Sequence, residues 1–331
     1  MRFLYFYLLR NLLPMKKLLW ILPLVLTACT STKSIKKLNE PYQVQQQQLS
    51  KTLQYLTSDE LEGRDSGSKG IELAANYLQN ILKENNIKPY FTTYKDTLSN
   101  FNKGIAYNVV GFIEGTDPKL KNEVVIFGAH YDHIGILTKG IIEGDSIANG
   151  ANDNAAGTTV LSEVAKYIAT KKDNKRSALV VFFSAEEKGL LGAYHLANKL
   201  EKDSLNFYTM LNFEMLGVPM TKEFKTYITG HKRSNMADKI NEYTNQNFVG
   251  YLPMETQYRL FMASDNFPFF LKYNFPAHSI SSFDFENYKY YHHPKDEFEK
   301  MDTAFMTEVV TSLLPAIDQL LNSETKEIQL H

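Results

Sequence analysis

The stretch SALVVFFSAEE (residues 177–187) is an unbroken apolar run that ends in two adjacent glutamates. A strand with one face in water alternates apolar and polar residues, and this run does not alternate, so it predicts a strand buried on both faces. EVVIFGAH (residues 123–130) and YTMLNFEMLG (residues 208–217) are similar runs that also carry polar residues at or near their ends. These runs predict the central strands of a sheet covered by helices.

Helical patterns lie between the apolar runs. Apolar residues recur at three- and four-residue spacing over residues 71–82 and 160–168, and a further helix is predicted from about 189 to 200. Alternating strands and helices predict an α/β fold with a mixed, largely parallel central sheet flanked by helices.

Three other segments complete this outline. YNVVGFIEG (residues 107–115) precedes EVVIFGAH by a short polar segment, which predicts a hairpin-type connection. An apolar helix over residues 305–321 should kink at Pro315. The less regular segment 218–262 is expected to pack beside the sheet or over a site.

Composition excludes some classes of protein. The chain has 331 residues, 44% of them hydrophobic, which is enough for one large folded domain. Its 36 basic and 37 acidic residues nearly balance, and no long block of one sign appears. We therefore expect no nucleic-acid partner.

The N-terminus resembles a targeting segment. MKKLLWILPLVLTAC (residues 15–29) has two lysines, an apolar core too short to cross a bilayer comfortably, and a small-residue cleavage region. LTAC resembles a bacterial lipobox, in which Cys29, the only cysteine, would be acylated. We predict a lipoprotein signal peptide over residues 1–28, starting at Met15 or Met1, a polar tether over 29–48 and one domain over 49–331. This places the protein in the bacterial cell envelope, lipid-anchored through Cys29; an uncleaved membrane anchor is the alternative.

Polar side chains follow the predicted strands, where open α/β sheets bind ligands. Three of them, His130, Asp132 and His133, lie at or after the end of EVVIFGAH. Glu186 and Glu187 end SALVVFFSAEE, Glu214 lies in YTMLNFEMLG, and Asp153 precedes a helix. Ordinary structural roles exist for some of them: Asp153 could cap its helix, and the glutamate pair could favour a helix dipole. Glu214, flanked by Phe213 and Met215, is costly to bury unless it is paired or binds metal.

The motifs GAHYDH, GANDNAAG, FFSAEEKGLLGA, NFEMLG and YHHPKDE occur in the order and spacing of the di-zinc aminopeptidases, the M28 metallopeptidases. LEGRDSGSKGIELAANYL, ASDNFPF and FPAHS also match, so the resemblance runs from about residue 49 to the C-terminal helix. It implies a peptide substrate and two Zn²⁺ ions. It assigns metal ligands at His130, Asp153, Glu187, Glu214 and His292, with Asp153 bridging both ions. Glu186 would be the general base and Asp132 the partner that orients His130.

The chain departs from the family pattern at two positions. Glu214 occupies a position that is more often aspartate, and His293 stands where a small polar residue is usual. No ligand role is implied for His133, which we expect in the loop or the pocket wall. His195 is expected to be structural, and His278 to be structural or to line the substrate pocket. The tyrosines at 288, 290 and 291 are expected to pack in the core or wall, or to supply one hydroxyl to a developing oxyanion.

The resemblance predicts a zinc-dependent exopeptidase that releases N-terminal residues through a bridging water activated by Glu186. Two other functions stay open at this point. One is a glutaminyl cyclase-like acyltransferase, and the other is an inert binding protein of the envelope. Inert relatives lose metal ligands, whereas every matched position here holds a competent ligand or base.

Overall fold

The computed structural model describes residues 42–203 and 205–331. The predicted signal peptide, the start at Met15 and Cys29 all lie outside the described residues. The folded unit begins at Tyr42, and helix α1 (Gln46–Leu56) contains three of the glutamines assigned to the tether. Tyr42 and Val44 pack against the core, so the folded unit begins before residue 49.

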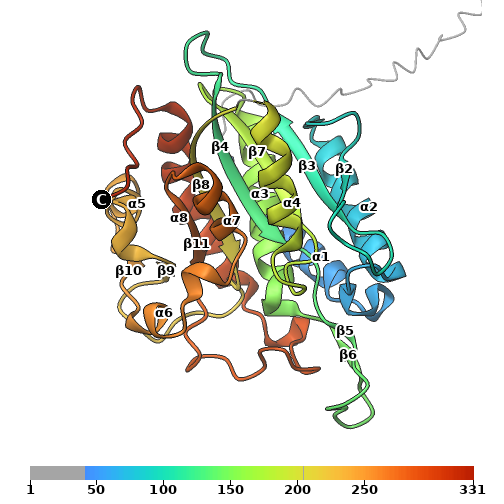
Figure 1. The fold of residues 1–331 in the computed structure, drawn as a ribbon. Helices are drawn as coiled ribbons and strands as arrows, with labels where there is room; N and C mark the ends of the chain where they lie inside the picture. Colours follow the sequence, from blue (N-terminus) through green and yellow to red (C-terminus); the bar gives the residue numbers. More distant parts are fainter. Residues whose placement is uncertain (1–41, 204) are drawn as a thin grey trace, which may run out of the picture. The chain divides into compact units, whose positions relative to one another are not determined.

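A nine-stranded sheet lies at the centre of the domain (Figure 1). Its strands follow the order β1 (Lys88–Pro89), β3 (Tyr107–Ile113), β7 (Ser177–Phe183), β4 (Glu123–His130), β8 (Asn206–Glu214), β11 (Ala277–Ser281), β9 (Thr226–Ile228) and β10 (Val249–Gly250), and β2 (Lys95–Thr97) pairs with β3. The four central strands β7, β4, β8 and β11 are parallel, while β3 and β9 run antiparallel to their central neighbours. The predicted mixed, largely parallel sheet is confirmed.

The predicted hairpin-type connection between β3 and β4 is wrong. Strand β7 lies between them, antiparallel to β3 and parallel to β4. The spacing of two neighbouring runs shows that both are strands. It does not show which distant strand separates them, because β4 is buried on both faces and accepts a parallel partner on each side.

Both faces of the sheet are covered by helices, as the lack of alternation in SALVVFF predicts. Val180 and Phe182 of β7 belong to a core formed with helices on one face, and Val181 and Phe183 belong to a separate core on the other. The first face packs against α1, α2 (Lys69–Glu84), α3 (Gly157–Lys171), α5 (Met236–Thr244) and α8 (Thr303–Asn322). The second packs against α4 (Leu191–Leu200) and α7 (Asn266–Tyr273), which lie in front of the sheet in Figure 1.

Helix α8 runs through Pro315 without interruption, although the sequence predicts a kink there. Pro315 lies on the exposed side of the helix, where carbonyl groups that lose an intrahelical partner can bond water. By length and composition α8 could cross a membrane. Ten of its twenty residues are buried in the domain, so α8 serves here as a core helix.

The irregular segment 218–262 does both things that were expected of it. Strands β9 and β10 extend the sheet, and α5 packs beside it. Helix α6 (Pro253–Gln257) leads into Leu260, which reaches the wall of the cavity described below. A small hairpin of β5 (Gly135–Ile136) and β6 (Ile147–Ala148) projects beyond the end of β4 (Figure 1).

Candidate metal centre

The five predicted metal ligands meet at the carboxyl end of the parallel strands. His130 and Glu214 are the last residues of β4 and β8, which pair directly. Glu187 lies in the turn after β7, Asp153 lies in the segment before α3, and His292 lies in the loop after β11. Neighbouring parallel strands end at the same edge of a sheet, which brings these distant side chains together.

The side chains form two groups that share Asp153. In the His130 group (His130, Asp153 and Glu214), Nε2 of His130 lies 3.1 Å from Glu214 Oε1 and 3.3 Å from Asp153 Oδ1. In the His292 group (His133, Asp153, Glu187 and His292), Nε2 of His292 lies 3.2 Å from Asp153 Oδ2 and 3.1 Å from Glu187 Oε2. Asp153 therefore presents one carboxylate oxygen to each group.

The residues fit zinc. Each group offers imidazole nitrogens and carboxylate oxygens, and within each group one such atom per residue lies within 4.8 Å of the others. Neutral imidazole and carboxylate are common zinc ligands, and closely spaced buried carboxylates are costly without a cation. The side chains of His130, Asp153 and Glu187 are at most 7% exposed.

Hydrogen bonds join the histidines and carboxylates of the two groups. Burial would lower the pKa of His292, but its hydrogen bonds to Asp153 and Glu187 raise it to about 10. Burial would likewise raise the pKa of Asp153, yet the hydrogen bonds from His130 and His292 hold it well below its ordinary value. The same atoms that hold these protons would hold a cation, and metal binding would displace the protons.

Asn154, and not Asp153, bonds the N-terminus of α3. The amide oxygen of Asn154 accepts the N–H of Gly157, the first residue of α3, at 3.1 Å, and the N–H of Met215 at 2.9 Å. Asn154 thereby ties the start of α3 to the end of β8. The adjacent Asp153 side chain points to both histidine groups instead.

Asp132 acts differently from the prediction. The ring Nδ1 of His130 lies 3.1 Å from the backbone carbonyl of Asp132, a hydrogen bond, but 3.7 Å from its carboxylate. The carboxylate instead accepts the N–H of Glu186 at 3.1 Å and the hydroxyl of Ser66 at 3.2 Å. The carbonyl of Asp132 thus orients His130, and its carboxylate fixes the turn that carries Glu186.

Glu186 lies beside the His130 group. It lines the same cavity as His130, Asp153 and Glu214. Burial raises the pKa of Glu186 well above its ordinary value, although the charge of His130 opposes this. A carboxylate that binds a proton more readily than usual is suited to general base and acid chemistry.

Arg64 is a residue that the sequence did not single out. Its buried guanidinium donates to the backbone carbonyls of Leu56, Tyr131, Asn149 and Gly150, which belong to α1, to the loop after His130 and to the segment before Asp153. Burial lowers the pKa of Arg64 to about 10, so it stays charged at neutral pH. It holds the two metal-binding loops together and offsets the nearby carboxylates. Its place in LEGRDSG, far along the chain from both loops, gave no signal of this.

Asp296 is a second such residue. Its buried carboxylate accepts the N–H groups of Asn152 and Asp153 at 2.8 and 3.1 Å, and the hydroxyl of Tyr288 at 2.5 Å. Tyr288 is therefore occupied, whereas Tyr291 lines the cavity and stacks on His292 with ring centroids 4.0 Å apart. Among the three tyrosines, Tyr291 is the one placed to face a substrate.

Of the four other histidines considered in the sequence, one lies in the His292 group and three lie outside both groups. His133 lies in the loop after β4, as expected, but its ring is buried in the His292 group, 2.9 Å from Glu187. Within the described residues, the one hydrogen bond of the His293 ring is accepted from the N–H of Lys295. His195 bonds Ser99 and Asp96, and His278 lies between Ser234 and Thr229, as expected of structural residues.

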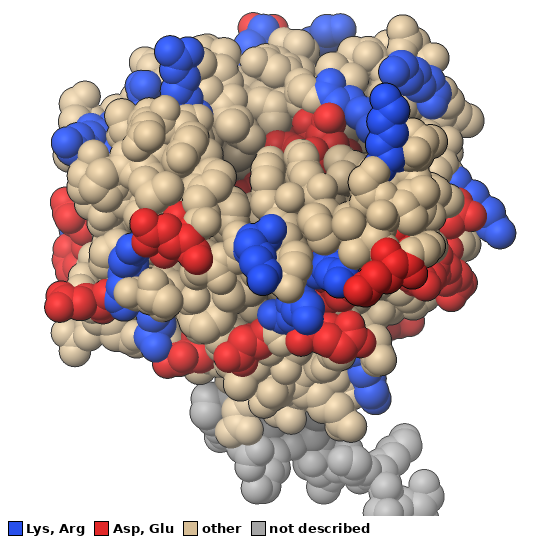
Figure 2. Space-filling view, turned by 90° about the horizontal axis from the view of Figure 1, so that it is seen from below, with Lys and Arg blue, Asp and Glu red and all other residues tan. Residues whose placement is uncertain are grey.

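A cavity opens on the His130 group. It encloses about 550 Å³ of space, including the solvent at its open mouth. His130, Asp153, Glu186 and Glu214 form one wall, and its largely apolar remainder includes Met215, Tyr227, Leu260, Phe283 and Phe285. Seen from this end of the molecule, acidic side chains lie recessed in a hollow framed by uncharged residues (Figure 2).

Fold and site together define an α/β protein with a cluster of metal ligands at the carboxyl end of its parallel strands. The model of peptidase family M28 matches residues 108–316, and the chain belongs to this family. Leucine aminopeptidase 1 of Sclerotinia sclerotiorum is 34% identical over 110 residues, which cover 32% of this chain and 27% of that protein. The chain thus spans only about a quarter of the length of this curated relative.

Solved structures share the fold at low identity. BSAP, a zinc aminopeptidase from Bacillus subtilis, superposes with a TM-score of 0.65 at 15% identity, covering 87% of this chain and 97% of that one. The glutaminyl cyclase of Porphyromonas gingivalis gives a TM-score of 0.64 at 15% identity, covering 83% and 98%. Both likenesses concern the fold.

Proposed function

We propose that the protein is a zinc-dependent exopeptidase that releases N-terminal residues from peptides. The observation that carries the proposal is the Asp153 carboxylate, whose Oδ1 lies 3.3 Å from His130 and whose Oδ2 lies 3.2 Å from His292. A carboxylate that faces two histidine–carboxylate groups with separate oxygens is suited to hold two cations.

Each proposed ligand has a defined place. His130 and Glu214 would hold one zinc ion, Glu187 and His292 the other, and Asp153 both. When bound, the ions would lower the pKa of a water molecule and polarise the scissile carbonyl. Ser264 donates a hydrogen bond of 2.8 Å to Glu214 Oε2, which leaves Oε1 directed to His130.

Glu186 would move the proton. Its carboxylate would take a proton from the attacking water and give it to the leaving amine. The raised pKa of this buried carboxyl suits it to hold a proton between the two events. Asp132 would act through its carboxylate, which holds the backbone of Glu186 in place.

The charge of the cavity favours an N-terminal over a C-terminal substrate. Among the described residues, its lining includes no lysine or arginine. A terminal carboxylate would need such a basic partner, whereas Glu186, the one lining carboxylate that is not a proposed zinc ligand, could accept a hydrogen bond from a free α-amine.

The Glu186→Gln variant tests the proposal. It should retain bound zinc and lose at least about 1,000-fold in kcat on aminoacyl anilides, because glutamine cannot accept the proton. Glu114→Gln, a surface change at an ion pair with Lys121, is the matched control and should behave as wild type. Hydrolysis by Glu186→Gln near the wild-type rate would refute the role of Glu186. Cyclisation of an N-terminal glutamine by the wild type, without anilide hydrolysis, would instead identify a glutaminyl cyclase.

We also propose that the protein is a lipoprotein of the bacterial cell envelope, cleaved before Cys29 and acylated there. The support is the sequence MKKLLWILPLVLTAC alone. Cys29→Ser should remove the protein from the membrane fraction of cells that export it. A variant that stays membrane-bound would favour an uncleaved anchor over residues 1–28.

A further inference from the structure

His133 is held rigidly against the metal ligands. Its backbone N–H donates to the carbonyl of Arg64 at 3.2 Å, and its ring is fully buried. Gly150 packs against the ring so closely that a Cβ atom there would lie 2.5 Å from Cγ of His133. A buried imidazole fixed in this way is placed for a specific contact.

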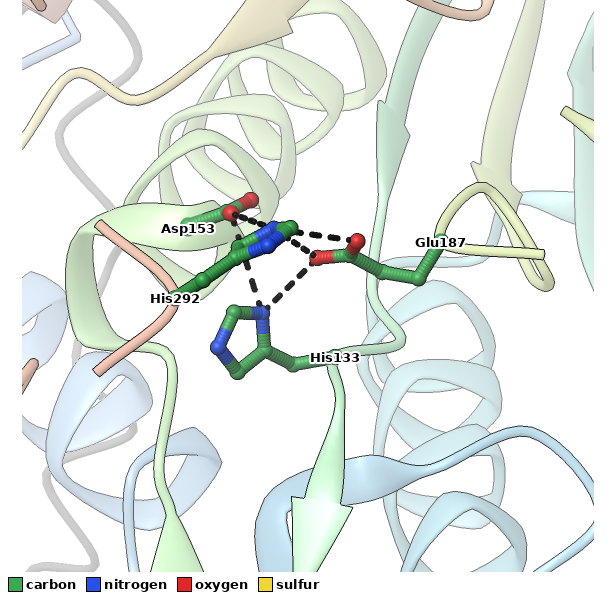
Figure 3. Close-up of side chains that lie close together, drawn as sticks. All are labelled: His133, Asp153, Glu187 and His292. Carbon is green, nitrogen blue, oxygen red and sulfur yellow. Dashed lines mark hydrogen bonds and ion pairs between the residues drawn. The ribbon is translucent and has the colours of Figure 1, made fainter. Parts of the chain in front are cut away.

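That contact is with the ligands themselves. Nδ1 of His133 lies 2.9 Å from Oε1 of Glu187 and 3.8 Å from Oδ2 of Asp153. In Figure 3 the rings of His133 and His292 both point toward Asp153 and Glu187, and their centroids lie 5.5 Å apart. Nε2 on the far side of the ring is buried and has no hydrogen-bond partner among the described residues. The ring is therefore oriented by what Nδ1 faces.

The distances suit a shared cation better than a hydrogen bond alone. Bonds of about 2.0–2.1 Å in a tetrahedral zinc site put neighbouring ligand atoms about 3.3 Å apart. Nδ1 of His133 is too far from Asp153 for a hydrogen bond, but its two distances lie on either side of this value. The pairs that His292 forms with Asp153 and Glu187, at 3.2 and 3.1 Å, lie close to it.

We propose that His133 is a fourth protein ligand, which closes the metal site of the His292 group. This inference rests on the proposed function, since it assumes that zinc binds there. Four protein ligands complete a tetrahedral site, whereas the three ligands of the His130 group leave a position open.

The lining of the cavity agrees with this difference in ligand number between the two groups. The cavity is lined by His130, Asp153 and Glu214 but not by His133, Glu187 or His292. A substrate in the cavity would reach the three-ligand site, and the four-ligand site would mainly hold the bridging carboxylate and support its partner.

The test compares His133→Ala with His293→Ala, a histidine nearby whose ring accepts a backbone N–H. Metal-depleted proteins are titrated with Zn²⁺ against a chelator and with Co²⁺ by absorption, and circular dichroism checks the fold. His133→Ala should weaken one of two sites by more than about 100-fold, as expected for a lost ligand, and leave the other within about threefold. The absorption of one bound Co²⁺ ion should change from that of a four-coordinate ion to the weaker absorption of a higher-coordinate ion. His293→Ala should match wild type.

His133→Asn separates a ligand from a hydrogen-bond donor. Its amide can still donate to Glu187 but is a poor zinc ligand, so it should not restore the lost affinity. Restoration by asparagine, or unchanged affinities and Co²⁺ spectrum in His133→Ala, would overturn the inference. If wild type bound no zinc, the proposed function itself would fail; two tight sites unaffected by His133→Ala would refute only the fourth ligand.

Discussion

The His130 group and the His292 group share the Asp153 carboxylate and differ in their number of candidate ligands and in their contact with the cavity. The His130 group has three candidate ligands, faces the cavity and lies beside Glu186. The His292 group has four, and apart from the shared Asp153 none of them lines the cavity. Under the proposed function, substrate would meet the first group and the second group would hold Asp153 in position.

Removing the shared carboxylate should have the largest effect, because it affects both groups at once. Asp153→Asn keeps the size of the side chain and removes the charge that each site uses. We expect loss of tight zinc binding at both sites and a fall in hydrolysis of more than about 1,000-fold.

Metal content by mass spectrometry and anilide hydrolysis measure this effect. Asp173→Asn, at an exposed ion pair with Lys171, is the control and should change neither. Retention of one zinc ion at wild-type affinity would mean that Asp153 is not shared.

Arg64 should affect the two groups equally, in contrast to His133. Arg64→Gln leaves several buried carbonyls without a donor, and we expect a loss of at least about 3 kcal/mol in the free energy of unfolding. Because Arg64 joins the loops of His130 and Asp153, zinc affinity should fall about 10- to 100-fold at both sites. Urea unfolding and chelator competition measure the two effects.

The matched control is Arg176, another buried arginine, which bonds Glu123 and the carbonyl of Ser323. Arg176→Gln should also lower the free energy of unfolding but leave zinc affinity unchanged. Equal loss of zinc affinity in both variants would mean that general instability, and not loop positioning, explains the result.

The smallest effect is expected at His278, a buried histidine outside both groups, and it concerns the free energy of unfolding. Nδ1 of His278 donates to the carbonyl of Thr229, Nε2 accepts from Ser234, and burial lowers its pKa to about 4. Since the folded pKa lies below the unfolded value near 6.5, the unfolded chain binds the proton first as the pH falls. The resulting stability is full above pH 6.5 and disappears toward pH 4, a change of up to about 3 kcal/mol.

His278→Gln should lower the free energy of unfolding at pH 7, because it disturbs the buried hydrogen bonds of the neutral imidazole. Since glutamine does not titrate, the difference from wild type should shrink as the pH falls from 6.5 to 4. Urea unfolding at several pH values measures it. A difference that stays constant with pH would show that this histidine does not carry the predicted linkage.

Much of the site could be predicted because strand ends carry their own signal. Runs without alternation, such as SALVVFF, mark buried strands and show where polar side chains such as His130, Glu187 and Glu214 leave the sheet. The full set of five ligands, including His292, came from the resemblance to the M28 family, and the structure brings all five together with Glu186 beside them.

The remaining features depend on contacts that spacing does not record. The insertion of β7 between β3 and β4 is a choice of distant partner. Three of the four backbone carbonyls that Arg64 bonds are more than sixty residues away, and Asp132 acts through the backbone of Glu186. The family resemblance implies no ligand role for His133, yet the turn after His130 directs the two rings to different groups.

The most direct test of the account is a zinc titration of the metal-depleted protein, followed by hydrolysis of an aminoacyl anilide. We predict that two zinc ions bind per chain and that hydrolysis reaches its maximum when both sites are filled. A protein that binds no zinc, or that binds it and hydrolyses no aminoacyl substrate, would contradict the account.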